Sequence, residues 1–195
     1  MGRPRLHSDD VILDAARDLV LEGGARSTTI NAIAKASGAP KGSVYHRYAS
    51  LDDLLAAMWI RAVRRAQGAF LEAIDQDDPT AAAIAGALSL HDFAQREPAD
   101  ARLLASMRRA DLVAAVDAPA LRRELDELNR PVQAAIAGLA RRMYGSATAG
   151  NVERMVCAVV DLPLGAVRRH LIAGAALPPT LRRQLEAAVR AALRG

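Results

Sequence analysis

The feature that most restricts the fold is the stretch KASGAPKGSVYHRYASLDDLL, residues 35–55, in which chain breaks alternate with short apolar segments. Gly38 and Pro40 lie two residues apart, so a continuous helix or strand through them is disfavoured. Two of the chain's three tyrosines, Tyr45 and Tyr48, follow in a segment too short to be a stable helix alone. The stretch therefore predicts short helices joined by a tight turn and held by their neighbours.

The composition favours an all-helical protein. Alanine and leucine dominate the 195 residues, and only 3% are aromatic, which is typical of helices packed on aliphatic side chains. A quarter of the residues are charged and half are hydrophobic, which indicates a globular chain rather than a disordered one. The net charge of +4 permits a nucleic-acid partner without demonstrating one.

Apolar residues at helical spacing predict about nine helices, of which three are short and N-terminal. Ser8, Thr29 and Ser50 precede such segments and are good N-cap residues. The later helices are predicted over residues 51–75, 80–96, 99–109, 121–144, 151–173 and 179–194. Pro163 lies inside the second-last of these and should kink it.

Two short helices joined by a turn that contains glycine form a helix-turn-helix. Gly38 can adopt the positive φ that ends the first helix, and Pro40 fixes φ at the entrance of the second. The second helix carries polar and basic side chains that can reach phosphates or base edges. We expect one of the two tyrosines to be buried and the other to face a partner. The alternative is a helical hairpin from a larger bundle.

Residues 8–58 resemble the DNA-binding domain of TetR-family transcriptional regulators. The similarity rests on ILDAARDLVLEGGARSTTINAIAKASGAPKGSVYHRYASLDDLLAAM, with I-A-x-x-x-G, K-G-S-V-Y-x-x-Y and S-x-x-x-L-L in register. It covers about a third of the chain, and the remainder resembles the family only in helical character and length. The resemblance implies a DNA-binding helix-turn-helix domain over residues 1–50 and a ligand-binding and dimerisation domain over residues 51–195.

The resemblance also implies which residues bind DNA. Thr29 would hold a phosphate at a helix N-terminus, and Asn31 would read a base. The full set is Thr29, Asn31, Lys41, Gly42, Ser43, Tyr45, His46 and Arg47. Leu51 departs from the family, which commonly has a phosphate-binding lysine there. Lys41, Arg47 or a basic arm at Arg3 and Arg5 would compensate; a disordered tail is the alternative for the arm.

A single helix-turn-helix presents little surface for specific reading, so we expect a homodimer that recognises a palindromic operator in double-stranded DNA. The predicted dimer interface consists of apolar residues near the C-terminus: Val152, Val156, Val159, Leu181, Leu185, Ala188 and Ala192. The alternative is that these residues only close the subunit's own core. The middle helices would frame a pocket for an unknown small-molecule effector, with Trp59, His91, Met107, Asn129 and Gln133 as candidate lining residues. Ordinary core or surface roles are the alternative for these five.

Catalytic signals are absent from the sequence. The four histidines show no metal-ligand spacing, and there is no phosphate-binding glycine loop, no G-x-S-x-G and no paired-cysteine motif. We therefore predict no enzyme activity, no metal and no cofactor. A polar N-terminus and the lack of any apolar run near ~20 residues predict a cytoplasmic protein without a membrane partner. The single cysteine, Cys157, is predicted to be a buried, inert thiol.

The function predicted from these patterns is a dimeric, sequence-specific transcriptional regulator. Repression relieved by a small-molecule effector is the commoner outcome in the family that the sequence resembles. One alternative is a DNA-binding regulator with a protein partner or with no effector. Another is a helical scaffold that does not bind DNA.

Overall fold

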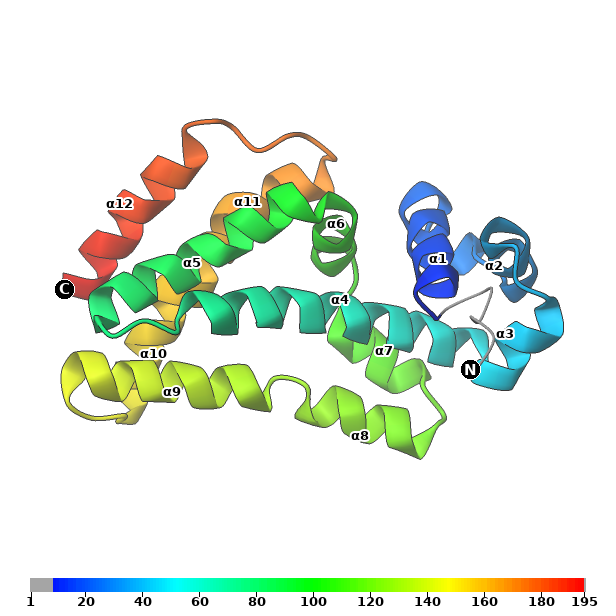
Figure 1. Ribbon diagram of the computed structural model, residues 1–195, viewed down its shortest axis with the longest axis horizontal. Coiled ribbons are helices and arrows are strands. Elements are labelled where there is room, and N and C mark those ends of the chain that lie inside the picture. The colour runs from blue at the N-terminus through cyan, green and yellow to red at the C-terminus, as the bar shows by residue number, and fades with distance from the viewer. Residues whose placement is uncertain (1–8, 195) are drawn as a thin grey trace, which may run out of the picture.

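The computed structural model describes residues 9–194, and its regular structure is entirely helical (Figure 1). The all-α prediction is thus confirmed for these residues. Ser8, Arg3 and Arg5 lie outside the described residues. The α-helices are α1 (Asp9–Gly23), α2 (Ile30–Ser37), α3 (Lys41–Arg47), α4 (Leu51–Ala73), α5 (Pro79–Arg96), α6 (Pro98–Ser106), α7 (Arg109–Ala115), α8 (Pro119–Glu127), α9 (Arg130–Tyr144), α10 (Ala149–Val156), α11 (Leu162–Ile172) and α12 (Leu181–Arg194).

The long helix α4 organises the molecule. It starts beside the short helices α1–α3 and continues through the middle of the chain, with α5, α6 and α11 on one side and α8 and α9 on the other (Figure 1). Ser50 caps its start by accepting a hydrogen bond from the backbone N–H of Asp53 at 3.0 Å, as predicted. The helix α4 therefore contacts both the short N-terminal helices and the rest of the subunit.

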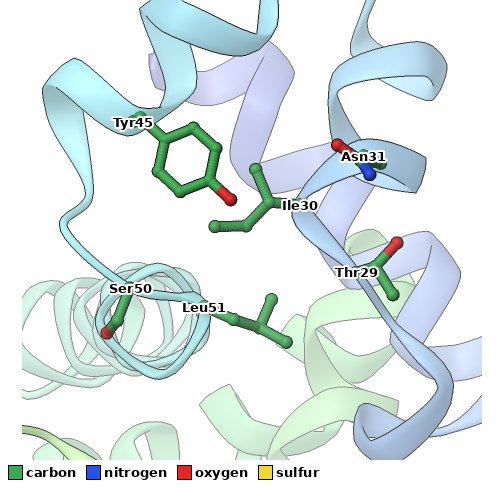
Figure 2. Close-up of a pocket in the computed structure, with 6 residues that line it drawn as sticks. All are labelled: Thr29, Ile30, Asn31, Tyr45, Ser50 and Leu51. Atoms are coloured by element: carbon green, nitrogen blue, oxygen red, sulfur yellow. The ribbon is translucent and has the colours of Figure 1, made fainter.

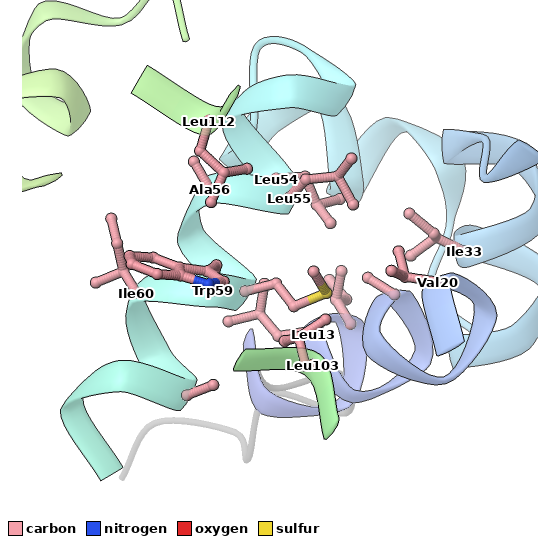
Figure 3. Packing of buried hydrophobic residues seen from close by; sticks show 14 of the residues in the cluster. Leu13, Val20, Ile33, Leu54, Leu55, Ala56, Trp59, Ile60, Leu103 and Leu112 are labelled. Carbon is pink, nitrogen blue, oxygen red and sulfur yellow. The ribbon is translucent and has the colours of Figure 1, made fainter. Parts of the chain in front are cut away.

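One hydrophobic cluster joins α1–α4 to the helices that follow. Figure 3 shows Leu13, Ile33 and Leu54 packed with Leu103 of α6 and Leu112 of α7. This first cluster therefore crosses the predicted domain boundary at residue 50. The division into residues 1–50 and 51–195 remains a prediction, and the packing indicates that the two parts are not separated by a flexible linker.

Two further clusters fill the other end of the molecule. The second joins the end of α4 to α5, α9, α10 and α12, and the third joins α5, α6, α11 and the start of α12. No helix among residues 9–194 combines the length and the hydropathy that a membrane crossing requires.

Two segments predicted as single helices are each divided. Residues 121–144 form α8 and α9, because Pro131 lies in the first turn of α9 and has no N–H to donate to the carbonyl four residues earlier. Residues 151–173 form α10, a π-helical turn (Cys157–Asp161) and α11. Pro163 has no N–H for the carbonyl four residues earlier, and the wider turn just before it accommodates this loss. The predicted irregularity at Pro163 is thus a change of helix type.

The C-terminal half contains two further differences from the sequence predictions. The helix predicted over residues 99–109 ends at Ser106, and a separate short helix, α7, follows it. The prediction of a buried Cys157 is wrong, because this thiol is exposed on the π-helical turn. Apolar neighbours in sequence do not bury a residue whose position on the helix faces outward.

Candidate nucleic-acid interface

The turn between α2 and α3 has the backbone geometry that the sequence predicts. Gly38 ends α2 in the left-handed conformation, with φ of 69°, and Pro40 precedes α3 with φ of −56°. Ile33 and Val44 are fully buried and hold the two helices against the first cluster. The short helix α3 is therefore stabilised by tertiary packing rather than by its own length.

The N-terminus of α2 borders a shallow groove of about 340 Å³ that also touches α3 and the start of α4. The hydroxyl oxygen of Thr29 accepts a hydrogen bond from the backbone N–H of Ala32 at 3.1 Å, which leaves the hydroxyl hydrogen free to be donated outward. Figure 2 shows Tyr45 of α3 facing Ile30 across this groove, with Leu51 extending from α4 toward α2. The groove thus combines a capped helix N-terminus with an apolar floor.

The outward face of α3 carries most of the predicted DNA-binding residues. Lys41, Gly42, Tyr45 and His46 are exposed, and Ser43 is partly exposed. The Lys41 ammonium lies 5.7 Å from the centre of the Tyr45 ring, so each side chain restricts the other. Thr29 and Asn31 at the start of α2 are exposed as well. The structure therefore brings seven of the eight predicted residues to one surface or its edge.

Arg47 differs from the other seven. Its guanidinium pairs with Asp9 of α1 at 3.2 Å, and only 20% of its side chain is exposed. Tyr48 beside it is partly buried against the first cluster. Burial and the Asp9 carboxylate raise the pKa of Tyr48 to about 12, against the lowering influence of Arg47 and Arg61. Tyr48 is accordingly the buried tyrosine and Tyr45, at 48% exposure, the exposed one.

A network of charged residues connects the first helix to α4 and α6. The buried carboxylate of Asp100 on α6 accepts hydrogen bonds from Arg17 of α1 at 2.8 Å and from Arg65 of α4 at 3.0 Å. Arg61 of α4 bonds Asp14 of α1 at 2.6 Å. Burial lowers the pKa of Arg17, but its hydrogen bonds to Asp100 and other carboxylates raise it by more, so the guanidinium is charged.

The sequence patterns described above do not predict this network of ion pairs. A signal exists in the sequence, because Asp10 and Asp14 lie four residues apart, as do Arg61 and Arg65, and such pairs share one helix face. Which acid meets which base is decided by how α1, α4 and α6 cross. The spacing alone does not give the buried position of Asp100.

The five predicted ligand-binding residues lie in different surroundings. Trp59 and His91 are buried, and Met107 is partly buried against the first cluster. Asn129 and Gln133 are exposed, and Asn129 accepts a hydrogen bond from Gln67 at 3.1 Å. Their ligand-binding role remains a prediction.

The predicted dimer-interface residues divide into two groups. Val159, Leu181 and Leu185 are buried within the subunit's own clusters, whereas Val152, Val156 and Ala192 are partly exposed and Ala188 is exposed. The first group therefore belongs to the subunit's own core and the second lies at the surface, and the interface itself remains a prediction. Within residues 9–194 no group of acidic, histidine or cysteine side chains is arranged to hold a metal ion.

A helix-turn-helix with an exposed second helix, packed on a larger helical domain, defines a class of DNA-binding regulatory proteins. Residues 12–58 match the family model described as bacterial regulatory proteins, tetR family. No curated protein sequence matches the chain.

Similar solved structures cover nearly the whole chain. The TetR-family transcriptional regulator PfmR from Thermus thermophilus is 17% identical, with a TM-score of 0.71 over 94% of this chain and 97% of that one. A TetR-like transcriptional regulator from Rhodococcus sp. RHA1 is 20% identical, with a TM-score of 0.70 over 100% and 99%. FadR from Bacillus halodurans, a fatty acid degradation regulator, is 14% identical, with a TM-score of 0.71 over 96% and 99%.

These structural similarities show the fold, and the match over residues 12–58 shows the character of the first domain. Residues 12–58 thus match the tetR family of bacterial regulatory proteins, and the chain shares the fold of solved TetR-family transcriptional regulators.

Proposed function

We propose that this regulator is a homodimeric repressor that binds a palindromic operator and releases it when a small-molecule effector binds. The observation that carries the proposal is the clustering of seven polar or small residues on the exposed face of α3 and the start of α2. In a helix-turn-helix the second helix enters the major groove. Lys41, Gly42, Tyr45 and His46 of α3 are exposed among residues 9–194, which suits this role.

The residues divide by the part of DNA that they would contact. The Thr29 hydroxyl, Lys41 and Tyr45 would contact phosphates, which position the protein without reading the sequence. Asn31, Ser43 and His46 would reach base edges, with asparagine suited to adenine. Gly42 would let the backbone approach DNA closely. Arg47, held by Asp9, would fix the orientation of α3 or reach a phosphate at its edge.

Two copies would bind through the outer faces of α10–α12, where Val152, Val156, Ala188 and Ala192 lie at the surface. Leu164 of α11, at 41% exposure, adds to the exposed apolar area of this region. A twofold dimer places two α3 helices on one face of DNA, which accounts for a palindromic site.

The effector would act through the contacts between α1, α4 and α6. Because Asp100 bonds both Arg17 and Arg65, a movement of α6 would be transmitted to α1 and thus to α3. By linkage, an effector that weakens operator binding must itself bind less tightly to the DNA-bound protein, by the same factor.

The test is to select genomic DNA fragments with the purified protein at two salt concentrations and to sequence them. We expect an enriched palindrome that persists at the higher salt, and an α3 variant, Lys41→Ala, that binds it less tightly with a salt slope smaller by about 0.9. Arg141→Ala in the last turn of α9, an exposed charge on a helix that lies away from α3 (Figure 1), is the matched control and should leave the slope unchanged. Binding without sequence preference, or equal losses in both variants, would argue against the assigned interface.

A further inference from the structure

A surface groove lies between α6 and α11, next to the end of α1. It consists of two adjoining hollows of about 380 and 460 Å³ that share Arg102 and Leu171. We call it the α6–α11 groove. Val20 and Leu21 of α1 form one wall, so the groove touches both the DNA-binding helices and the larger domain. Each hollow is within the size range of small-molecule sites.

Three arginines border the α6–α11 groove, and no carboxylate lines it. These are Arg102, Arg108 and Arg168. None of them forms an ion pair or a side-chain hydrogen bond with another residue of the part of the chain that the structure describes. Other arginines nearby, such as Arg17 and Arg65, meet carboxylates. The groove therefore presents uncompensated positive charge.

The floor of the groove is apolar. Leu171 and Val20 are almost fully buried there, whereas Ile172 is 58% exposed, the most exposed large hydrophobic side chain among residues 9–194. Arg168 precedes Ile172 by four residues on α11, so both lie on the same helix face. An apolar surface beside positive charge suits a ligand that is apolar at one end and anionic at the other.

We propose that the α6–α11 groove binds an organic anion with an aliphatic body, such as a carboxylate carried on a short alkyl chain. The arginines would pair with the carboxylate, and arginine presents a planar fork of donors that matches it. The alkyl chain would cover Ile172 and the wall formed by Val20 and Leu21. This proposal concerns binding and stands without the effector role proposed above.

Arg102 is also placed by the backbone around it. Its guanidinium lies 3.4 Å from the point where a side chain on Gly174 would begin. Gly174 has φ of 64° and follows the end of α11, and its lack of a side chain leaves this space to the guanidinium. Arg102 is partly buried, lines both hollows of the groove and lies beside the Gly174 turn.

The test measures binding of octanoate by isothermal titration calorimetry, without DNA. Octanol has the same chain without charge, and acetate has the charge without the chain. We expect octanoate to bind with one site per subunit and both comparison compounds to bind at least about tenfold more weakly, since each lacks one of the two interactions. An absence of octanoate binding at millimolar concentration, or octanol binding as tight as octanoate binding, overturns the proposal.

Variants locate the site. Arg102→Gln combined with Arg108→Gln should weaken octanoate binding by about tenfold or more. Arg123→Gln combined with Arg141→Gln, two exposed arginines on α8 and α9, is the matched control and should leave the affinity unchanged. Equal losses in the two double variants would show that octanoate responds only to net charge, which overturns the assignment to this groove.

Ile172→Glu provides a second variant that does not depend on the arginines. Ile172 is exposed, so the substitution is compatible with folding, and it places a carboxylate where the ligand would lie. We expect octanoate binding to be lost in this variant while its circular dichroism spectrum and melting temperature stay close to wild type. Retained binding would overturn the assignment.

Two further measurements separate the possible sources and consequences of the binding. Vesicles containing phosphatidylglycerol test a membrane headgroup, and binding to vesicles without binding of free octanoate would contradict a small-molecule site. Operator affinity measured with and without octanoate tests the effector role. If octanoate binds in the groove and the operator affinity is unchanged, the binding site is supported and its regulatory role is rejected. If the protein binds no operator at all, only the proposed function as a DNA-binding regulator is rejected.

Discussion

The buried carboxylate of Asp100 provides the most direct test of how the first domain is attached to the second. Asp100 is 1% exposed and accepts hydrogen bonds from Arg17 and Arg65, which come from two different helices. The substitution Asp100→Asn keeps the size of the side chain and removes its charge. Both arginines then lose their buried partner.

The magnitude follows from what remains around the two arginines. Breaking a fully buried ion pair typically costs about 3–5 kcal/mol. Arg17 retains Asp14 and Asp18, each at 3.0 Å, while the side chain of Arg65 is 37% exposed. We therefore expect a smaller loss of about 2–3 kcal/mol in the free energy of unfolding. For a chain of this size the melting temperature should fall by about 4–12 °C.

The assay is urea unfolding followed by far-ultraviolet circular dichroism. The control is Asp18→Asn, which removes another carboxylate that pairs with Arg17 but is 57% exposed. This control should cost less than about 1 kcal/mol, because exposed ion pairs are screened by solvent. If the free energies of unfolding of the two variants differ by less than about 0.5 kcal/mol, the buried contacts of Asp100 are no stronger than a surface ion pair. That result would refute the reasoning.

Three further predictions address DNA binding, pH and packing. Leu51→Lys should tighten DNA binding and steepen its salt dependence by about 0.9 in the log–log slope, measured by fluorescence anisotropy; an unchanged slope would mean that the added ammonium reaches no phosphate. Burial raises the pKa of Asp92, but the hydrogen bonds from Arg182 and His91 have a larger effect and lower this pKa in the folded protein. The ionised Asp92 carboxylate therefore stabilises the fold at pH values above the unfolded pKa of about 3.9, and this stabilisation is lost as the pH falls through the folded pKa. Asp92→Asn should therefore cost under about 1 kcal/mol at neutral pH and nothing at pH well below 4, in urea unfolding at both pH values; a constant difference would contradict this. Gly86→Ala should destabilise the protein by about 1–3 kcal/mol in the same assay, since the new Cβ would lie 2.6 Å from the Ile74 side chain, and a gain in stability would show that α4 and α5 separate easily.

Local sequence signals predict much of the fold, because they depend on neighbouring residues. Thr29 and Ser50 cap their helices, and Gly38 takes a positive φ, as their residue types indicate. The same holds for the polar face of α3, where spacing alone separates the buried Val44 from the exposed Tyr45. These features are decided within a few residues of chain.

Features that depend on how helices cross could not be predicted in this way. The apolar stripe through Leu181 and Leu185 is equally suited to an internal core or to an interface, and the packing of α12 on α5 decides that both residues are buried within the subunit. Cys157 lies in an apolar run and yet is exposed, since the π-helical turn directs it outward.

The helical class, the helix-turn-helix and its exposed residues can thus be read from the order of residues, because capping, turn chemistry and helical periodicity are local. The contact of Asp100 with both α1 and α4, and the gathering of Arg102, Arg108 and Arg168 around one apolar groove, arise only when the helices pack. These residues are far apart in the chain or on different helices. The energy of a charge depends on its burial and on its neighbours, and both are set by the packing of helices rather than by their sequence order.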